Sequence, residues 1–205
     1  MSEPTSAFRR QILPEAHRAV QVDAAAPLYV VMGVTAVGKS SVAAALSDVL
    51  TVDWIDADNL HPEPNIRKMS SGIPLLDEDR WPWLDEVGAR LAAASRGTGL
   101  IVACSALRRS YRDRLRLHAS VGFIHLTGPA DTLRRRAQER TGHFMPPSLL
   151  DSQLSILEPL DQDERGVTFE INEPAHAIAE RVRRWIMSDA GRRPPSTAAM
   201  QPRIT

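Results

Sequence analysis

Residues 28–50 read LYVVMGVTAVGKSSVAAALSDVL, and this stretch decides the fold. Its first five residues form an apolar run that predicts a buried β-strand, and Gly33 ends that run. Residues 40–50 follow, and their apolar side chains recur at helical spacing, which predicts an amphipathic helix. A strand, a loop with glycine at both ends and a helix therefore follow one another directly.

Residues 33–40 of that loop match the spacing G-x-x-x-x-G-K-[ST], in the strand–loop–helix context that the motif requires. Such a loop wraps its amide N–H groups around an anion, and the helix N-terminus adds a partial positive charge. We therefore predict a phosphate-binding loop for a nucleotide. Its predicted binding residues are Gly33, Val34, Thr35, Ala36, Val37, Gly38, Lys39, Ser40 and Ser41.

Two residues of the loop have predicted chemical roles. Lys39 is expected to reach the β- and γ-phosphates and to act in catalysis, and the Ser40 hydroxyl is expected to ligate Mg²⁺. ATP and Mg²⁺ are therefore the expected cofactors.

Apolar runs elsewhere predict four further strands, and helical patterns separate them. The strands are expected at 52–55, 99–104, 123–126 and 167–171. The helices are expected at 81–94, over the arginine-rich segment that ends at Leu117, from Asp131 onward, and around 178–186. Strands that alternate with helices are parallel and joined by crossovers. The predicted class is a three-layer α/β fold in which helices flank a parallel sheet of about five strands.

Composition bounds the organisation of the chain. Its 205 residues fit one domain, which we place at 28–188, with flexible tails at 1–27 and 189–205. The 25 basic and 25 acidic residues cancel, which removes the broad positive charge expected of a general nucleic-acid binder. Cys104 is the single cysteine, so no intrachain disulfide can form. No apolar stretch approaches the length of a membrane span, and a cytoplasmic protein with no membrane partner is expected.

Asp56 and Asp58 follow the second predicted strand. In an extended segment this spacing would place both carboxylates on the same side. Asp56 could then reach Mg²⁺ through water, while Asp58 orients an accepting hydroxyl and takes its proton. The alternative is a solvated acidic turn.

Several longer blocks resemble the gluconate kinase (gluconokinase) family, relatives of shikimate kinase. They run in the family's order over residues 28–186. The blocks are DADNLHP at 56–62, NIRKMSSGIPL at 65–75, DEDRWPWL at 77–84, CSALRRSYRD at 104–113, the arginines of 136–140, GHFM at 142–145, SQ at 152–153 and LEPL at 157–160.

This resemblance implies phosphorylation of D-gluconate at its 6-hydroxyl by ATP, giving 6-phosphogluconate and ADP. It also implies a homodimer and a helical lid at about 136–150, in which Arg136 and Arg140 face the ATP phosphates and Arg136 acts in catalysis. The expected substrate-binding residues are Asp58, His61, Arg67, Lys68, Arg80 and Ser105.

Each of these roles has a plainer alternative. The planar fork of Arg80 suits the gluconate carboxylate, but Arg80 could instead form a surface ion pair with Asp77 or Asp79. The other basic residues named above could simply be solvated on helix faces. Ala36 stands where the family usually has glycine, and a positive φ there would strain it by about 1 kcal/mol.

Three rival functions remain at this point. The first is a kinase of the same fold for another sugar acid or for shikimate. The second is an ATP-binding sensor without turnover. The third is a nucleic-acid-binding role, supported by the arginine-rich segment 108–116 alone.

Overall fold

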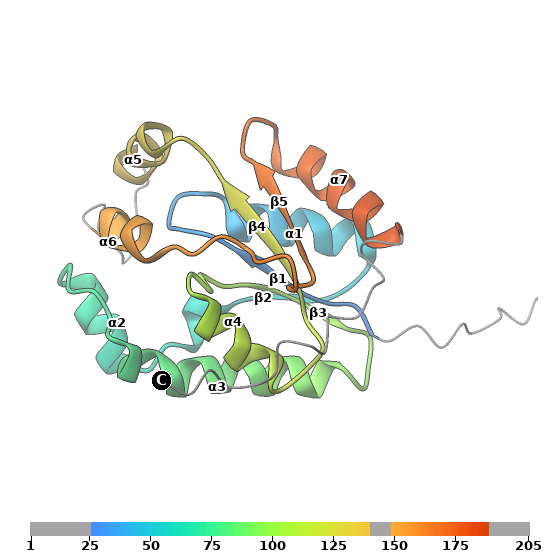
Figure 1. Cartoon of the computed structure of the whole chain (residues 1–205), viewed down its shortest axis with the longest axis horizontal. Coiled ribbons are helices and arrows are strands. Elements are labelled where there is room, and N and C mark those ends of the chain that lie inside the picture. The colour runs from blue at the N-terminus through green and yellow to red at the C-terminus, as the bar shows by residue number, and fades with distance from the viewer. Residues whose placement is uncertain (1–25, 140–148, 189–205) are drawn as a thin grey trace, which may run out of the picture.

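The computed structural model describes residues 26–139 and 149–188, and these residues contain one five-stranded sheet (Figure 1). The strands run parallel in the order β2-β3-β1-β4-β5. They are β1 (Leu28–Met32), β2 (Trp54–Asp56), β3 (Leu100–Ala103), β4 (Gly122–Thr127) and β5 (Gly166–Glu170). The predicted sheet is confirmed, and each strand begins and ends within two residues of its expected bounds.

Helices cover both faces of the sheet, which confirms the three layers (Figure 1). One layer consists of α1 (Lys39–Leu50) and α7 (Ala175–Met187), and the other of α3 (Asp77–Ala94) and α4 (Arg109–Arg116). Tyr29 and Val31 of β1 belong to the core cluster of α1 and α7, whereas Val30 and Met32 belong to that of α3 and α4. Because both faces are buried, β1 reads as a continuous apolar run instead of an alternating one.

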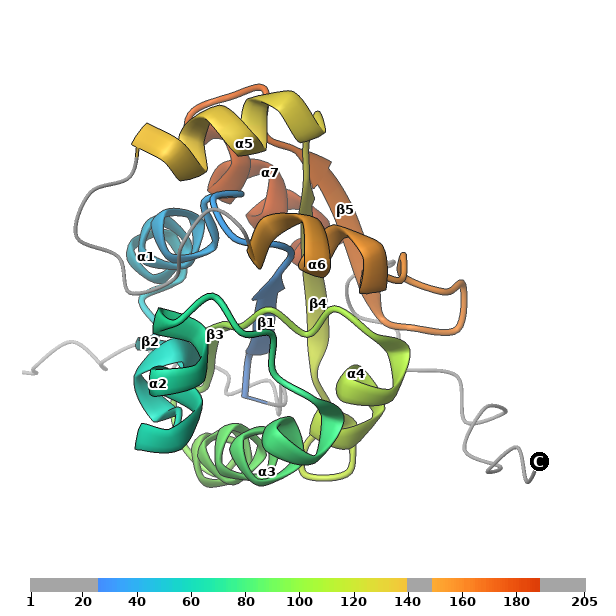
Figure 2. The ribbon, with the colours of Figure 1, turned by 90° about the vertical axis from the view of Figure 1, so that its left-hand side faces the viewer.

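The remaining helices gather at one end of the sheet, on the left in Figure 1 and toward the viewer in Figure 2. They are the 3₁₀-helix η1 (Ala57–Leu60), α2 (Glu63–Ser70), α5 (Ala130–Glu139) and α6 (Leu149–Ile156). The pattern analysis predicted α5 but not η1, α2 or α6. Each of these three has at most eight residues, too few to display a sustained apolar stripe.

Helix α3 begins at Asp77, four residues before the expected start. The Asp79 carboxylate accepts a hydrogen bond from the Leu76 N–H at 2.9 Å, which satisfies one of the amides at the helix start. Acidic residues also stabilise the positive end of the helix dipole. These two effects extend α3 into the acidic segment.

The predicted lid at about 136–150 lies largely outside the described residues, since α5 ends at Glu139 and α6 begins at Leu149. The predicted tails lie outside them as well, apart from residues 26 and 27. Within 26–139 and 149–188, none of the helices combines the length and the apolar composition needed to cross a bilayer.

Candidate active site

The phosphate loop connects β1 to α1, as predicted, and its backbone requires glycine at both ends. Gly33 has a φ of 137°, and a Cβ there would lie 2.6 Å from the Leu126 carbonyl oxygen. Gly38 has a φ of 95° and is the N-cap of α1. Ala36 between them has a φ of 61°, so the strain expected of alanine at this position is present.

The start of α1 is suited to an anion. No side chain caps it, and its first turn contains no acidic residue. The amides of that turn therefore remain available to phosphate oxygens, and no carboxylate repels them. Lys39 lies in this turn and lines the pocket described below, where its Nζ donates to the Val34 carbonyl oxygen at 3.1 Å.

Ser40 and Asp56 meet across the sheet edge, because the Ser40 hydroxyl donates to Asp56 Oδ2 at 2.6 Å. The other carboxylate oxygen of Asp56 accepts the Asp58 N–H at 3.1 Å and so caps η1. The prediction of an extended segment from Asp56 to Asp58 is therefore wrong. The chain turns into a 3₁₀-helix at Ala57, and the Asp56 carboxylate serves the first amides of that helix.

An open pocket lies between the phosphate loop, η1, α3 and α6. Five residues with predicted roles line it, namely Lys39, Asp58, His61, Arg80 and Ser105. The other lining residues are Met69, Pro74, Leu75, Trp83, Leu107, Leu149, Ser152 and Gln153. The structure therefore brings one cation from the phosphate loop, one carboxylate and one arginine to a single cavity.

Arg80 is half-enclosed at the pocket wall, with 13% of its side chain exposed. Its Nη1 donates to the Leu75 carbonyl oxygen at 2.5 Å and to the Tyr111 hydroxyl at 3.3 Å, and lies 3.8 Å from Asp77 Oδ1. The ion pair considered as an alternative is thus present with Asp77, but it is long. The guanidinium is fixed mainly by neutral oxygens and keeps its charge available to a ligand in the pocket.

His61 is a neutral wall of the same pocket. Its ring stacks on Trp83 with centroids 4.1 Å apart, and its Nδ1 lies 3.4 Å from Asn65 Nδ2. Burial, assisted by the positive charge of Arg80, lowers the pKa of His61 to about 4. At neutral pH the imidazole is therefore uncharged.

Arg67, Lys68 and Arg136 have predicted roles but do not line the pocket, and a fourth such residue lies outside the described part of the chain. Arg67 is exposed and pairs with Glu63 at 3.4 Å on the surface of α2. The Nζ of Lys68 contacts both Asp79 oxygens at 2.6 and 2.8 Å, which holds the Asp79 pKa below its usual value. Arg136 is exposed on α5, and Arg140 lies outside the described residues. Binding roles for these four remain predictions.

Several site residues were missed by pattern reasoning, above all Leu149, Ser152 and Gln153 of α6. The family-like SQ block at 152–153 was the one signal in the sequence, and it carried no role. The side-chain amide oxygen of Gln153 accepts the Thr35 N–H of the phosphate loop at 2.6 Å. This contact joins residues 118 positions apart, which no local spacing could predict.

A buried arginine, Arg112, supports one wall of the pocket. Arg112 binds both carboxylate oxygens of Glu164 at 2.7 Å, and both side chains are fully buried. Its remaining N–H groups donate to the carbonyl oxygens of Ala106, Leu107, Glu158 and Pro159 at 3.0–3.3 Å. Since Leu107 lines the pocket, Arg112 fixes one wall by bonding to its backbone.

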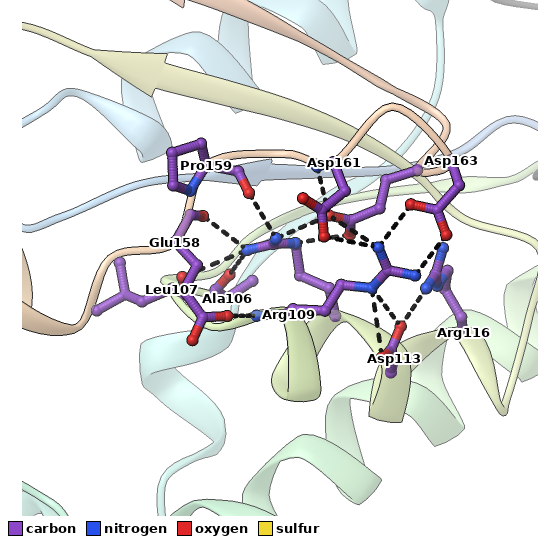
Figure 3. A network of polar contacts seen from close by, with 11 residues as sticks. Ala106, Leu107, Arg109, Asp113, Arg116, Glu158, Pro159, Asp161 and Asp163 are labelled. Atoms are coloured by element: carbon purple, nitrogen blue, oxygen red, sulfur yellow. Dashed lines mark hydrogen bonds and ion pairs between the residues drawn. The ribbon is translucent and has the colours of Figure 1, made fainter. Parts of the chain in front are cut away.

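The neighbouring Arg109 adds a more exposed layer to this network, through Asp113, Asp161 and Asp163 (Figure 3).

Cys104 is fully buried, and burial raises the pKa of its thiol to about 12. It therefore stays protonated and packs as a small apolar residue.

No group of three or more histidine, cysteine or acidic side chains gathers as a metal site in the described part of the chain. The hydroxyl and carboxylate of Ser40 and Asp56 are nevertheless the hard oxygen donors that Mg²⁺ prefers. Mg²⁺ in nucleotide sites typically takes only one or two protein ligands together with phosphates and water. The residues present thus fit the ion.

Known proteins resemble this chain over most of its length. A family model described as shikimate kinase matches residues 35–184. The thermosensitive gluconokinase of Escherichia coli (strain K12) is 40% identical over 164 residues, which cover 78% of this chain and 87% of that protein.

Two solved structures show the same similarity. A gluconokinase from Sinorhizobium meliloti 1021 is 45% identical with a TM-score of 0.67, covering 78% of this chain and 94% of that one. A sugar kinase from Janibacter sp. HTCC2649 is 43% identical with a TM-score of 0.76, covering 81% and 97%. Together with the phosphate loop and the pocket beside it, these similarities show that the chain belongs to the gluconokinase family of phosphate-loop kinases.

Proposed function

We propose that the protein transfers the γ-phosphoryl group of ATP to the 6-hydroxyl of D-gluconate, giving 6-phospho-D-gluconate and ADP. The observation that carries this proposal is the shared pocket, in which Lys39 of the phosphate loop, Asp58 of η1 and Arg80 of α3 line one cavity. A sugar acid has a carboxylate at one end and hydroxyl groups along its chain. Arg80 suits the carboxylate and Asp58 suits a hydroxyl.

Phosphoryl transfer requires positioning and charge stabilisation more than covalent chemistry from the protein. The loop amides and Lys39 hold the phosphates. Asp58 orients the accepting hydroxyl toward them and accepts its proton. Neutral His61 and Trp83 form an uncharged wall, which favours a polyhydroxy chain over a second anionic group.

Mg²⁺ is part of the proposal, with Ser40 as a direct ligand and Asp56 bound through water. When bound, it neutralises charge on the β- and γ-phosphates. The Ser40–Asp56 hydrogen bond supports this assignment because it already holds the two oxygen donors together. We also propose that Arg136 and Arg140 belong to a lid at about 136–150 that stabilises the transferring phosphoryl group.

The rival functions are not favoured. The E. coli relative named above and one from Gluconobacter oxydans (strain 621H), at 40% and 45% identity, are both gluconokinases. A sensor without turnover would not need an aspartate and an arginine facing the phosphate loop. A nucleic-acid role loses its support because the arginines of α4 are bound by carboxylates, such as Glu164 and Asp85.

A cytoplasmic homodimer with no nucleic-acid or membrane partner completes the proposal. The dimer is tested by light scattering on the full chain, in which the mass of one 22.6 kDa chain would contradict it.

The function is tested by measuring ADP release with Mg-ATP and a panel of acceptors: gluconate, other aldonates, shikimate, AMP and none. We expect turnover that depends on gluconate, and ³¹P NMR should show a phosphomonoester at C6. Lys39→Ala should lower kcat by about 100- to 1000-fold, by analogy with removal of one oxyanion donor. Turnover with shikimate but not gluconate, or ATP binding without any turnover, would contradict the proposal.

Arg80→Gln gives a second test, with Arg90→Gln as its matched control. Both residues lie on α3, but Arg90 is exposed and pairs with Glu86 at 2.8 Å. Arg80→Gln should raise the KM for gluconate by about 10- to 100-fold, since hydrogen bonds to charged groups contribute about 1.5–3 kcal/mol. The control should behave like wild type.

A further inference from the structure

Helix α6 directs one face into the pocket, made of Leu149, Ser152 and Gln153, which are spaced three and four residues apart. Two leucines of α6 also anchor the helix to the rest of the fold. Leu150 is buried in the core cluster of α1 and α7, and Leu149 packs with Met69 of α2 and with Leu75. Helix α6 therefore contacts both the phosphate loop, through Gln153, and α2, through Leu149.

Gln153 is the one residue of that face with a hydrogen bond to the phosphate loop. Its Oε1 accepts the Thr35 N–H at 2.6 Å, and Thr35 is itself buried. The orientation of the amide group follows from this contact, because a backbone N–H donor must face the oxygen and not the NH₂ group. The nitrogen Nε2 is therefore the end of the amide group that does not contact Thr35.

Nε2 has no hydrogen-bond acceptor among the described residues, although the side chain is half-buried in the pocket wall. An NH₂ group carries two donors, and a partly buried donor gains from a ligand acceptor. The pocket already offers a cation at Arg80 and an acceptor at Asp58. The NH₂ group of Gln153 would add a neutral hydrogen-bond donor to the positive charge of Arg80 and the acceptor of Asp58.

We infer that Gln153 orients the acceptor: held by Thr35 through Oε1, it donates from Nε2 to a hydroxyl oxygen of the sugar acid. The inference rests on the proposed function and deepens it, since it assigns a specificity residue to the same pocket. Because its own position is fixed by the phosphate loop, Gln153 ties the place of the acceptor to the place of the phosphates. The bond forms only with an acceptor that has a hydroxyl at the matching carbon.

The test compares Gln153→Met with Gln162→Met. Methionine keeps the length and apolar packing of glutamine but removes both the acceptor and the donor. Gln162 lies exposed in the loop before β5, so the control makes the same chemical change away from the pocket. We expect Gln153→Met to raise the KM for gluconate about 10-fold, the effect of one lost hydrogen bond, with the KM for ATP within about twofold of wild type.

Gluconate analogues that each lack one hydroxyl identify the contact. With wild type, every missing hydroxyl that is bound should lower kcat/KM. With Gln153→Met, one of these analogues should lose no further activity relative to gluconate, because its partner on the protein is already gone. Gln153→Glu retains an acceptor for Thr35 but no donor, and should reproduce the KM increase without a fall in thermal stability.

Three results would overturn the inference. A lower KM for ATP with an unchanged KM for gluconate would make Gln153 a competitor of the nucleotide. An equal loss with every analogue, together with a lower melting temperature in both variants, would make it a structural tie. An unchanged KM for gluconate would exclude any contact. A wild type without turnover on any sugar acid is a separate result, which would refute the proposed function as well.

Discussion

Replacing Arg112 by methionine should cost more stability than any other single arginine change in the described residues. Arg112 and Glu164 are both fully buried, and their two 2.7 Å contacts form a bidentate pair. Removal of one partner from such a pair leaves an uncompensated buried charge and costs about 3–5 kcal/mol. Four backbone carbonyls lose a donor as well, so the upper part of this range is expected.

The helix that carries Arg112 also offers a matched control. Arg114 binds both oxygens of Asp85 at 2.6 and 2.7 Å, in the same bidentate manner. Its side chain is 40% exposed, however, so the pair is solvent-screened. Arg114→Met should therefore cost only about 0–1 kcal/mol. The bidentate pair is common to both arginines, so the difference between the two variants comes from the burial of Arg112 and from its additional backbone hydrogen bonds.

Urea unfolding followed by circular dichroism measures these differences directly. For a domain of this size, a loss of 3–5 kcal/mol corresponds to a fall in Tm of roughly 6–20 °C. The double variant Arg112→Met with Glu164→Leu removes both charges and should lose less stability than Arg112→Met alone. Equal costs for the Arg112 and Arg114 variants, or a double variant that is no more stable than Arg112→Met alone, would refute the argument.

Three smaller changes test the loop and the pocket. Ala36→Gly should relieve the strain of φ 61° and raise the free energy of unfolding by up to about 1 kcal/mol in urea titrations; a decrease would contradict the strain argument. His61 has a folded-state pKa of about 4, below its unfolded value near 6.5, so the unfolded chain takes up the proton first and stability should fall as pH drops from about 6.5 to 4. His61→Phe should flatten that decline, and an unchanged pH profile would exclude His61 as its cause. Asp58→Asn should lower kcat/KM by about 100-fold or more, and a value within a few-fold of wild type would remove Asp58 from the chemistry.

Elements that are determined by a local residue pattern could be predicted from the sequence. The strand 28–32 appears with its predicted ends because both faces of β1 are buried, and a continuous apolar run is the direct imprint of that burial. The glycines of the phosphate loop were equally legible, since their positive φ values restrict the residue type.

Elements that are held in place by contacts with distant parts of the chain could not be predicted from the sequence. Helix α2 starts with a glutamate and a proline and is too short to show a sustained apolar stripe, yet it is held through Met69 against Leu75 and Leu149. Asp58 lines the pocket, but not in the extended geometry expected for it. The chain forms η1 at this point because the Asp56 carboxylate accepts the Asp58 N–H and caps that helix.

The site itself follows from strand order, which local spacing does not encode. Strand β3 lies between β1 and β2, with Val31 and Asp56 both aligned to Ala103. Parallel pairing then places the segments that follow all three strands at one edge. This is why the Gly33 N–H reaches the Ser105 carbonyl at 3.2 Å, while Ser40 reaches Asp56 from the far side of the loop. Had β2 paired directly with β1, Ser105 would lie at the outer edge and could not line a pocket shared with Lys39. The motifs therefore determine which residues have side chains suited to the chemistry of the site. The position of β3 between β1 and β2 determines which of these residues lie together.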